Sequence, residues 1–540
     1  MDLLTPLALL ALTALQVGEA PHVYPGSTCK LEQLTGERDA ARGVFTRSRT
    51  ETSAKLVATD LGSSFEHDGE LYFLFGDSVG GERHADVLAW TGAETPDELT
   101  LAFHTDEKGL FRRLELPGIT SGPFEVPSYG ISLDGDIYVA FTTDHSERNT
   151  MGRSVLGRSR DDGRTFERLF DISTKRFINV AMERAKQQEH EHLPERDCVL
   201  VWGSGRYRAS SARLAYAPTK SFDERESWRY FAGLSNGKPR WSPDEAQSID
   251  LFDHPVVGEL SVAWIATLER WVMLYNSTAP RGIVMRTAEE PWGPWTDSEV
   301  VFDPWLDKGY ANFMHVGWKS SRRDAFHDAG QKDKWGGEYG PYLIPRFTTG
   351  DAERCTLVFS MSTWNPYQVV LMATDVGRPP ATVKQRETRF LPGTKPFVSE
   401  GSEVVRFDRN GSPHVRTYGE GGDKDLLVSH HVIRPITGST LSFSIHGGHS
   451  RIVLVRDDHP PPGPIKDIAA FERDLLTGTY GPVLESIAGP GSNDVDVSVR
   501  WSLSRHAGQR LRVYLVDAAT DRWGFVSVSE MTVRQPARGR

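Results

Sequence analysis

Two aspartates bracket one strand-like run of the sequence. Asp60 and Asp77 stand near the ends of segment 59–77, TDLGSSFEHDGELYFLFGD, whose second half alternates as a β-strand does. A third acid, Glu259, stands inside the apolar run 256–265, VVGELSVAWI. A carboxylate in such surroundings costs several kcal/mol unless it is paired or hydrogen-bonded, and burial raises its pKa. A carboxyl group with a raised pKa can act as a general acid, while an ionised carboxylate opposite it acts as base or nucleophile.

A pair of carboxyl groups of this kind is what hydrolysis of a glycosidic bond requires. Their separation decides the stereochemistry, because about 6.5–9.5 Å leaves room for a water molecule and inverts the anomeric centre, whereas about 5–5.5 Å retains it. For each acid taken singly, a structural role in a turn or a hydrogen-bonded core fits equally well. The sequence therefore predicts a carboxylate pair and leaves the stereochemistry open.

Aromatic and polar residues at other strand ends could hold a sugar. Aromatic rings stack on the apolar faces of sugars, while arginine, asparagine and carboxylate side chains form hydrogen bonds with hydroxyl groups. The candidates are Glu125 in GPFEVPSYG, Arg206, Tyr207 and Arg208 in GSGRYRASS, Tyr339 in GGEYGPYLIPRF, and Trp364 and Asn365 in SMSTWNPYQ; the last two segments also offer Glu338, Tyr342, Arg346 and Tyr367. Packing between sheets would use Trp364 equally well.

The elements that must position these residues recur along the chain. Each instance is a turn followed by a short apolar strand and a polar stop, which is the signature of repeated sheets. The five instances are Asp68–Asp77, Asp134–Asp144, Asp197–Gly205, Glu269–Asn276 and Glu353–Thr363. Their spacing suits a blade of four strands, so the sequence predicts an all-β chain with a five-bladed β-propeller. In a propeller, polar residues that flank the inner strands meet near one axis.

One hairpin motif marks the fold rather than the chemistry. Residues 159–166, SRDDGRTF, fit the S-x-D-x-G-x-T-[WF] pattern known as the Asp box in sialidases and other propellers. The serine and aspartate side chains of such a turn satisfy its backbone, and the aromatic residue packs behind it. We therefore expect Asp161 to be structural.

The rest of the chain is predicted to flank this propeller. The expected units are a signal peptide at 1–20, an N-terminal segment at 21–54, the catalytic propeller at 55–378, a linker at 379–400 and a jelly-roll-like β-sandwich accessory domain at 401–540. Helical signals are sparse, and the best lies at Asp467–Leu476. The three cysteines allow one bridge at most, and buried thiols fit the apolar runs after Cys198 and Cys355 better.

Composition narrows the partners. The formal net charge of −11, with no basic stripe, argues against nucleic acid, and no segment after the signal peptide is long and apolar enough to span a membrane. Phosphate-loop, GxGxxG and HExxH motifs do not occur. We expect an exported, secreted or periplasmic monomer that acts on a poly- or oligosaccharide. It requires no cofactor and no metal at the catalytic site, although a structural calcium ion at the propeller axis would be compatible.

Several segments together carry a family resemblance. TDLGSSFEHDGELYFLFGDS, GELSVAWIATLERWVMLYN, RTAEEPWGPW, YGPYLIPRF and STWNPYQVVLM resemble a family of exported five-bladed propellers long labelled only as a domain of unknown function. Some of its members are endo-D-arabinanases, and the family is similar to the wider set of arabinanases, xylosidases and β-fructosidases. The resemblance covers about residues 55–378, and it implies an arabinanase-like glycoside hydrolase that cleaves a furanoside-containing polysaccharide.

The resemblance also implies roles for the acids. In the wider set, an aspartate on the first inner strand is base or nucleophile, a second aspartate tunes pKa values, and a glutamate from a middle blade is the acid. Asp60 matches the first and Glu259 the acid, while Asp77, Asp144 and Asp253 are all compatible with the second, of which we choose Asp77. The C-terminal strands resemble the sandwich appended to β-fructosidases, which implies an accessory or sugar-binding role.

Two alternatives remain open at this point. The chain could be a non-catalytic carbohydrate-binding propeller, in which Asp60 and Glu259 are structural acids or ligands of a central cation. It could also be a sialidase-like hydrolase, as the Asp box suggests. That activity needs three arginines and a tyrosine nucleophile, usually on six blades, whereas five are legible here.

Overall fold

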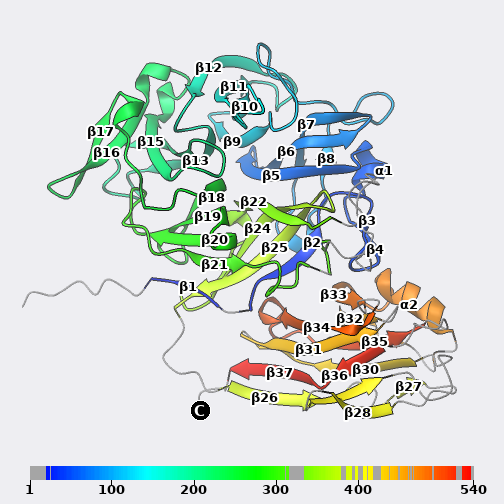
Figure 1. Cartoon of the computed structure of the whole chain (residues 1–540). Coiled ribbons are helices and arrows are strands. Elements are labelled where there is room, and N and C mark those ends of the chain that lie inside the picture. The colour runs from blue at the N-terminus through cyan, green and yellow to red at the C-terminus, as the bar shows by residue number, and fades with distance from the viewer. Residues whose placement is uncertain are drawn as a thin grey trace, which may run out of the picture.

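Figure 1 shows the computed structural model of the chain, in which five sheets of at least four strands, built from the first 377 residues, lie above two sheets of the C-terminal part. The structure describes residues 20–24, 26–310, 312–315, 334–378, 385–391, 396–398, 405–409, 412–416, 427–436, 438–447, 451–459, 461, 465, 467–488, 492–518 and 526–536. The expected signal peptide therefore falls almost wholly outside the described residues, as does much of the expected linker.

The first two sheets are four-stranded antiparallel meanders. Their strands are β5 (Ala58–His67), β6 (Glu70–Gly80), β7 (Glu82–Thr91) and β8 (Ala102–Phe103), then β9 (Pro127–Leu133), β10 (Asp136–Thr143), β11 (Arg153–Ser159) and β12 (Glu167–Ser173). The third and fourth sheets repeat the pattern with β13 (Asn179–Lys186), β14 (Asp197–Ser204), β15 (Ala212–Pro218), β16 (Arg229–Ser235) and β17 (Lys238–Ser242), then β18 (Val257–Ile265), β19 (Arg270–Thr278), β20 (Arg281–Ala288) and β21 (Glu299–Phe302).

The fifth sheet joins distant parts of the chain. It contains β22 (Gly337–Leu343), β23 (Thr349–Gly350), β24 (Cys355–Trp364) and β25 (Gln368–Gly377), and both β1 (His22–Val23) and β2 (Cys29–Gln33) pair with β25. The expected N-terminal segment thus completes the last sheet. The first strands β5, β9, β13, β18 and β22 each contact the next, and β22 contacts β5, so the described sheets surround one axis in a propeller-like ring.

The apolar runs found in the sequence are the second strands of these sheets. β6, β10, β14, β19 and β24 each pair with a strand on both sides, and their residues are buried on both faces, which explains their nearly unbroken apolar character. The Asp-box motif is the turn between β11 and β12. There Asp161 accepts hydrogen bonds from the backbone and hydroxyl groups of Thr165 at 2.8 and 2.7 Å, and Phe166 packs on Phe141. The structural role expected for this motif is confirmed.

Short elements fill the connections around the ring. They are β3 (Arg38–Asp39), β4 (Val44–Phe45), α1 (Thr50–Ala54) and the 3₁₀ turns Pro96–Glu98, Thr219–Ser221, Arg225–Ser227, Glu245–Gln247 and Pro345–Phe347, while a further 3₁₀ turn, Ser504–His506, lies in the C-terminal part. All three cysteines are buried free thiols.

The C-terminal part contains two sheets that share a hydrophobic cluster. One has β26 (Gln385–Phe390), β37 (Met531–Pro536), β31 (Thr440–Gly447), β36 (Val526–Ser529), β29 (Ser412–Arg416), β28 (Val405–Arg409) and β34 (Ser492–Ser502). The other has β27 (Pro396–Val398), β30 (Leu427–Ile433), β35 (Leu511–Asp517), β32 (Arg451–Arg456) and β33 (Val483–Ala488). Because β26 pairs with β37, part of the expected linker is a strand of this unit.

The helix expected at 467–476 is α2 (Ile468–Leu476). Asp467 caps its N-terminus by accepting a hydrogen bond of 2.9 Å from the backbone of Ala470. Its apolar side, which includes Phe471 and Leu475, packs in a cluster with residues of β32 and β35.

Arg505 joins the C-terminal unit to the N-terminal segment. Its guanidinium donates hydrogen bonds of 2.9 Å to the thiol of Cys29 and to Glu485, and Glu485 also lies 3.7 Å from Arg42. These groups are largely buried, so the polar cluster fixes how the two parts meet.

Candidate active site

One end of the ring collects the polar residues. In an antiparallel sheet, the start of the first strand lies beside the connection between the second and third strands. Asp60, Glu259 and Tyr339 stand near the starts of the first strands β5, β18 and β22. The β14–β15 and β24–β25 connections supply further side chains at the same end, so segments far apart in the sequence converge on one pocket.

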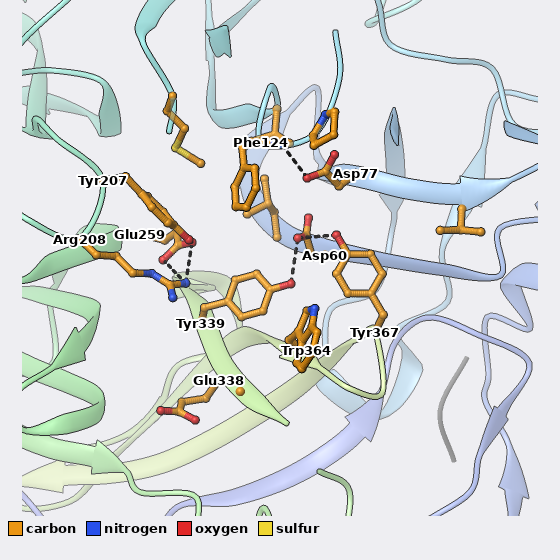
Figure 2. A pocket seen from close by; sticks show the side chains of 16 residues that line it. Asp60, Asp77, Phe124, Tyr207, Arg208, Glu259, Glu338, Tyr339, Trp364 and Tyr367 are labelled. Carbon is orange, nitrogen blue, oxygen red and sulfur yellow. Dashed lines mark hydrogen bonds and ion pairs between the residues drawn. The ribbon is translucent and has the colours of Figure 1, made fainter. Parts of the chain in front are cut away.

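This pocket has a volume of about 470 Å³. Figure 2 shows its lining, which consists of Asp60, Leu61, Asp77, Val79, Pro123, Phe124, Val126, Met151, Tyr207, Arg208, Glu259, Gly337, Glu338, Tyr339, Trp364 and Tyr367. Seven of the ten residues predicted from the sequence line it, which are Asp60, Asp77, Tyr207, Arg208, Glu259, Tyr339 and Trp364.

The three inner strands are irregular where they carry the site. The pairing register shifts on both sides of the Asp60–Leu61 pair in β5, beside Glu259 in β18, and just after Tyr339 in β22. Leu61 also has φ +63, a left-handed conformation that is strained for a branched residue. Such bulges turn a side chain away from its regular face, and here they direct polar groups of otherwise apolar strands to the pocket.

Asp60 is held by two tyrosines. It is 7% exposed, and its Oδ2 accepts hydrogen bonds from the hydroxyls of Tyr339 at 2.9 Å and Tyr367 at 2.7 Å. Its Oδ1 has no hydrogen-bond partner among the described residues. Burial, followed by the negative charge of Asp77, raises the pKa of Asp60 well above its usual range, although the two tyrosine hydroxyls oppose this shift.

Asp77 lies on the neighbouring strand, at the same end of the first sheet. Its Oδ2 accepts a hydrogen bond of 3.0 Å from the backbone of Phe124, and its φ of +46 marks another irregular position. The buried Asp86 accepts a hydrogen bond from the backbone of Asp77, and burial and the Asp77 charge raise the pKa of Asp86 well above its usual range. Three acids therefore gather on β5, β6 and β7.

Glu259 stands across Tyr339 from Asp60. It is 4% exposed, and it accepts a hydrogen bond of 2.8 Å from Tyr207 and an ion pair from Arg208, whose Nη2 lies 3.2 and 3.3 Å from the two oxygens. The guanidinium of Arg208 also lies 5.7 Å from the centre of the Tyr339 ring. In Figure 2, Tyr339 lies between this group and Asp60. The two carboxyl groups thus face one cavity with separate sets of partners.

Three predicted contact residues do not line the pocket. Glu125 is buried and accepts hydrogen bonds from Thr120 and the backbone of His145, so it ties loops together. Asn365 is buried and donates to the carbonyl of Lys334, while Arg206 is exposed outside the lining.

The alternative second aspartates also lie outside the lining. Asp144 forms an ion pair with Arg153 at 2.8 Å, and Asp253 is exposed. Asp77 is therefore the one of the three that shares the pocket with Asp60.

The structure adds Phe124 and Met151, which sequence reasoning did not select, to the walls of the pocket. Tyr367, which contacts Asp60 directly, and Glu338 also line it, and both stand in segments that the sequence had already indicated. Phe124 adjoins Glu125, but nothing in the sequence says which of two neighbours faces a cavity.

Within the described residues, donor atoms close enough to share a metal ion occur in one group, which comprises His67, Asp68 and Asp162. This group lies outside the pocket lining, and its two aspartates are exposed. The described residues therefore show no carboxylate cage for the axial calcium ion considered above. In the same part of the chain, no helix is both long and apolar enough to cross a bilayer.

Comparison with known proteins gives distant relatives. Over 308 residues, 49% of this chain and 77% of the relative, the chain is 26% identical to the Notoamide biosynthesis cluster protein J of Aspergillus sp. (strain MF297-2). Among solved structures it is similar to an exo-β-1,3-galactanase of Phanerochaete chrysosporium, with 8% identity, a TM-score of 0.42, and coverage of 94% of this chain and 100% of that chain. It is also similar to the catalytic domain of a Coprinopsis cinerea α-L-arabinofuranosidase, with 10% identity, a TM-score of 0.34, and coverage of 65% and 98%.

The family match covers the site. Residues 46–373 match the model of the family described as Domain of unknown function (DUF4185), and this span includes every residue that lines the pocket. The membership that the sequence motifs indicated is confirmed, and the chain belongs to the DUF4185 family.

Proposed function

We propose that the chain is a glycoside hydrolase whose carboxyl pair is Asp60 and Glu259. The observation that carries the proposal is that these two acids, from the first and fourth sheets, face one 470 Å³ pocket between aromatic walls. A pair of acids with different partners across a sugar-sized cavity is the apparatus of glycosidic hydrolysis. On this proposal the five sheets are the blades of a propeller, and the two C-terminal sheets form a sandwich-like accessory domain.

Asp60 is proposed as the base or nucleophile. This role comes from the family resemblance, because the raised pKa of Asp60 by itself favours the protonated form. Once Asp60 has lost its proton, its ionised form is a strong base, with one oxygen held by Tyr339 and Tyr367 and the other without a described partner. Asp77 supplies the charge that raises this pKa, which is the role assigned to it from the resemblance.

Glu259 is proposed as the general acid. The guanidinium of Arg208 forms an ion pair with its carboxylate at 3.2 Å. A general acid must carry the proton that it delivers to the leaving oxygen, so on this proposal the substrate displaces Arg208, or competes for it, when Glu259 acts. Tyr207, which donates to the same carboxylate, keeps the group oriented during this exchange.

The charge of the pocket supports a neutral sugar. Four carboxyl groups, those of Asp60, Asp77, Glu259 and Glu338, line it with a single guanidinium among the described residues, and Glu259 already pairs with that guanidinium. A substrate carboxylate would meet net negative charge and no set of three arginines. This argues against the sialidase-like alternative, although Tyr207 and Glu259 form a tyrosine–carboxylate pair.

The substrate class comes from the family resemblance. We propose a furanoside-containing, arabinan-like polysaccharide cleaved outside the cell, with residues 1–20 as the export signal. The non-catalytic binding module remains the competing function, because a sugar could occupy the same pocket without being cleaved.

The test is hydrolysis of arabinans, fructans and xylans by the purified protein, with product analysis, beside Asp60→Asn and Glu259→Gln. We expect cleavage of an arabinan that falls at least about 10²-fold in both variants while their melting temperatures stay near or above that of the unaltered chain. Glu125→Gln, a buried carboxyl group outside the pocket, is the matched control. Binding without cleavage, or cleavage that survives both changes, would refute the catalytic proposal.

A further inference from the structure

Three aromatic residues form a cluster outside the pocket that the mechanism above does not use. The ring centres of Trp305 and Tyr310 are 4.8 Å apart, those of Trp305 and Trp335 are 5.5 Å apart, and those of Tyr310 and Trp335 are 5.1 Å apart. Tyr310 is buried, but Trp305 is 53% and Trp335 41% exposed. We call these three residues the aromatic platform.

The platform is connected to the pocket through Arg281 and Glu338. Arg281 donates a hydrogen bond of 2.6 Å to the hydroxyl of Tyr310, and its guanidinium lies 3.2 and 3.3 Å from the two oxygens of Glu338. Glu338 lines the pocket, and in Figure 2 it lies on the side away from Asp77. The guanidinium thus bridges the platform and the pocket wall, while half of the Arg281 side chain stays exposed.

A second connection runs along the edge of the fifth sheet. Gly337 of β22 pairs with Trp364 of β24, which is 38% exposed and lines the pocket. Trp335 lies two residues before Gly337, which is about 7 Å along an extended chain. Tyr310 also donates a hydrogen bond of 3.1 Å to the carbonyl of Gly336. Exposed indole surface therefore leads from the pocket rim to the platform.

We infer that the aromatic platform is a distal subsite that holds a neutral polysaccharide chain whose end or middle occupies the pocket. The two partly exposed indoles are inclined to each other by 61°, so each presents its own apolar ring surface on which a sugar ring can stack, and Arg281 beside them offers donors to hydroxyl groups. The identity of the ligand rests on the proposed function, and the inference goes beyond that function by adding a second binding site.

The continuity with the pocket favours a sugar chain over a protein. The platform is two exposed indoles beside a charged side chain, rather than a broad apolar face of the kind that protein partners cover. A polymer bound here would bury the two indoles one sugar unit at a time. Substrates too short to reach the platform would gain nothing from it, so the platform distinguishes long from short chains.

The test uses the full chain with Trp305→Ala, Trp335→Ala and the double variant. Leu306→Ala is the matched control, because Leu306 adjoins Trp305 and is the more exposed residue but contributes no ring. Retention on immobilised arabinan, fructan and xylan is measured with each change combined with Glu259→Gln. The values of kcat/KM on polymer and on a short oligosaccharide are measured with Glu259 unaltered.

We expect each single change to weaken retention on one polysaccharide about two- to tenfold, and to lower the ratio of polymer to oligosaccharide kcat/KM by a similar factor. Trp335→Phe should restore part of the loss. Circular dichroism melting confirms that each variant is folded.

The outcomes separate this inference from the proposed function. Retention that depends on the tryptophans without any hydrolysis supports the platform and refutes the hydrolase. Hydrolysis with an unchanged polymer ratio in the double variant refutes the platform and leaves the hydrolase. The platform is likewise refuted if no polysaccharide is retained, or if Trp305→Ala abolishes a concentration-dependent dimer instead, since the surface would then contact a second copy of the chain.

Discussion

The hydroxyl of Tyr367 donates a hydrogen bond of 2.7 Å to Oδ2 of Asp60, which joins the last sheet of the ring to the first. The bond lies where the ring closes, because β5 contacts β22, and both β24 and β25 lie beside β5. The carboxyl group at the centre of the proposed chemistry is therefore oriented by the contact that completes the fold.

Replacing Tyr367 by phenylalanine should move the acid limb of the pH–rate profile to higher pH. The hydroxyl stabilises the ionised form of Asp60, so its loss raises the pKa of that carboxyl group further. The measurement is kcat/KM against pH on the substrate identified above, with Tyr342→Phe as control. Tyr342 lies on the same strand as Tyr339 but donates no described hydrogen bond to Asp60. An acid limb that stays in place would show that Tyr367 only packs.

Replacing Asp77 by asparagine should move the same limb in the opposite direction. The charge of Asp77 raises the pKa of Asp60, and the amide carries no charge while its oxygen can still accept the hydrogen bond from the backbone of Phe124. The acid limb of kcat/KM therefore moves to lower pH. Asp144→Asn, at an aspartate outside the pocket, should leave it unmoved. If Asp77→Asn and Tyr367→Phe shift the limb in the same direction, the electrostatic explanation is wrong.

Asp60 should oppose folding at neutral pH. Its folded pKa is raised above the unfolded value of about 3.9, so its contribution to stability is fully present below about pH 4 and is lost as pH rises through the folded pKa. An uncharged amide at this position would carry no such penalty. We therefore expect Asp60→Asn to raise the free energy of unfolding at pH 7.5, and the gain to shrink at pH 4.5.

Denaturant unfolding at both pH values measures this effect. Asp106→Asn is the control, and it should lower the free energy of unfolding at pH 7.5. The backbone N–H of Leu110 stabilises the ionised form of the exposed Asp106 and lowers its pKa. A loss of stability at pH 7.5 for Asp60→Asn would mean that the contacts with the tyrosines outweigh the cost of burying the charge.

Arg505 should be essential to the junction between the N-terminal segment and the C-terminal unit. Its removal leaves Cys29 without its donor and Glu485 with Arg42 alone, at 3.7 Å. We expect Arg505→Leu to lower the free energy of unfolding of the C-terminal unit by about 3 kcal/mol, the range for breaking a buried ion pair. Arg510→Leu, at a more exposed ion pair with Asp457, is the control. Equal effects of the two changes on denaturant unfolding would contradict a special role for the junction.

Local patterns predicted the strands well. The five apolar runs became β6, β10, β14, β19 and β24, because alternation and turn residues are properties of neighbouring positions. The convergence of Asp60, Asp77 and Glu259 was also predictable, since antiparallel sheets bring corresponding strand ends to one side.

The sequence did not reveal which side chains face the pocket or which distant strands pair. One step of register turns a side chain to the other face of a strand, and bulges decide that step at Asp60, Glu259 and Tyr339. Glu125 and Asn365 stand in the connections before β9 and after β24, where no periodicity says which side chain faces the pocket, and both were wrongly predicted to line it. The pairing of β1 and β2 with β25 joins residues more than 300 positions apart, and no local pattern encodes such a contact.

Glu259→Gln should discriminate between substrates by their leaving groups. A general acid is needed only when the departing oxygen must be protonated, so cleavage of the polysaccharide should fall by about 10²–10⁴-fold, whereas an activated aryl furanoside should lose far less. Asp60→Asn should reduce the cleavage of both substrates, because a better leaving group does not compensate for the loss of the base or nucleophile. Glu338→Gln, another pocket carboxyl group, should leave the ratio between the two substrates unchanged. The reverse pattern, with Asp60→Asn sparing the activated substrate, would exchange the two roles, since it would make Asp60 the proton donor and Glu259 the group that attacks or activates water.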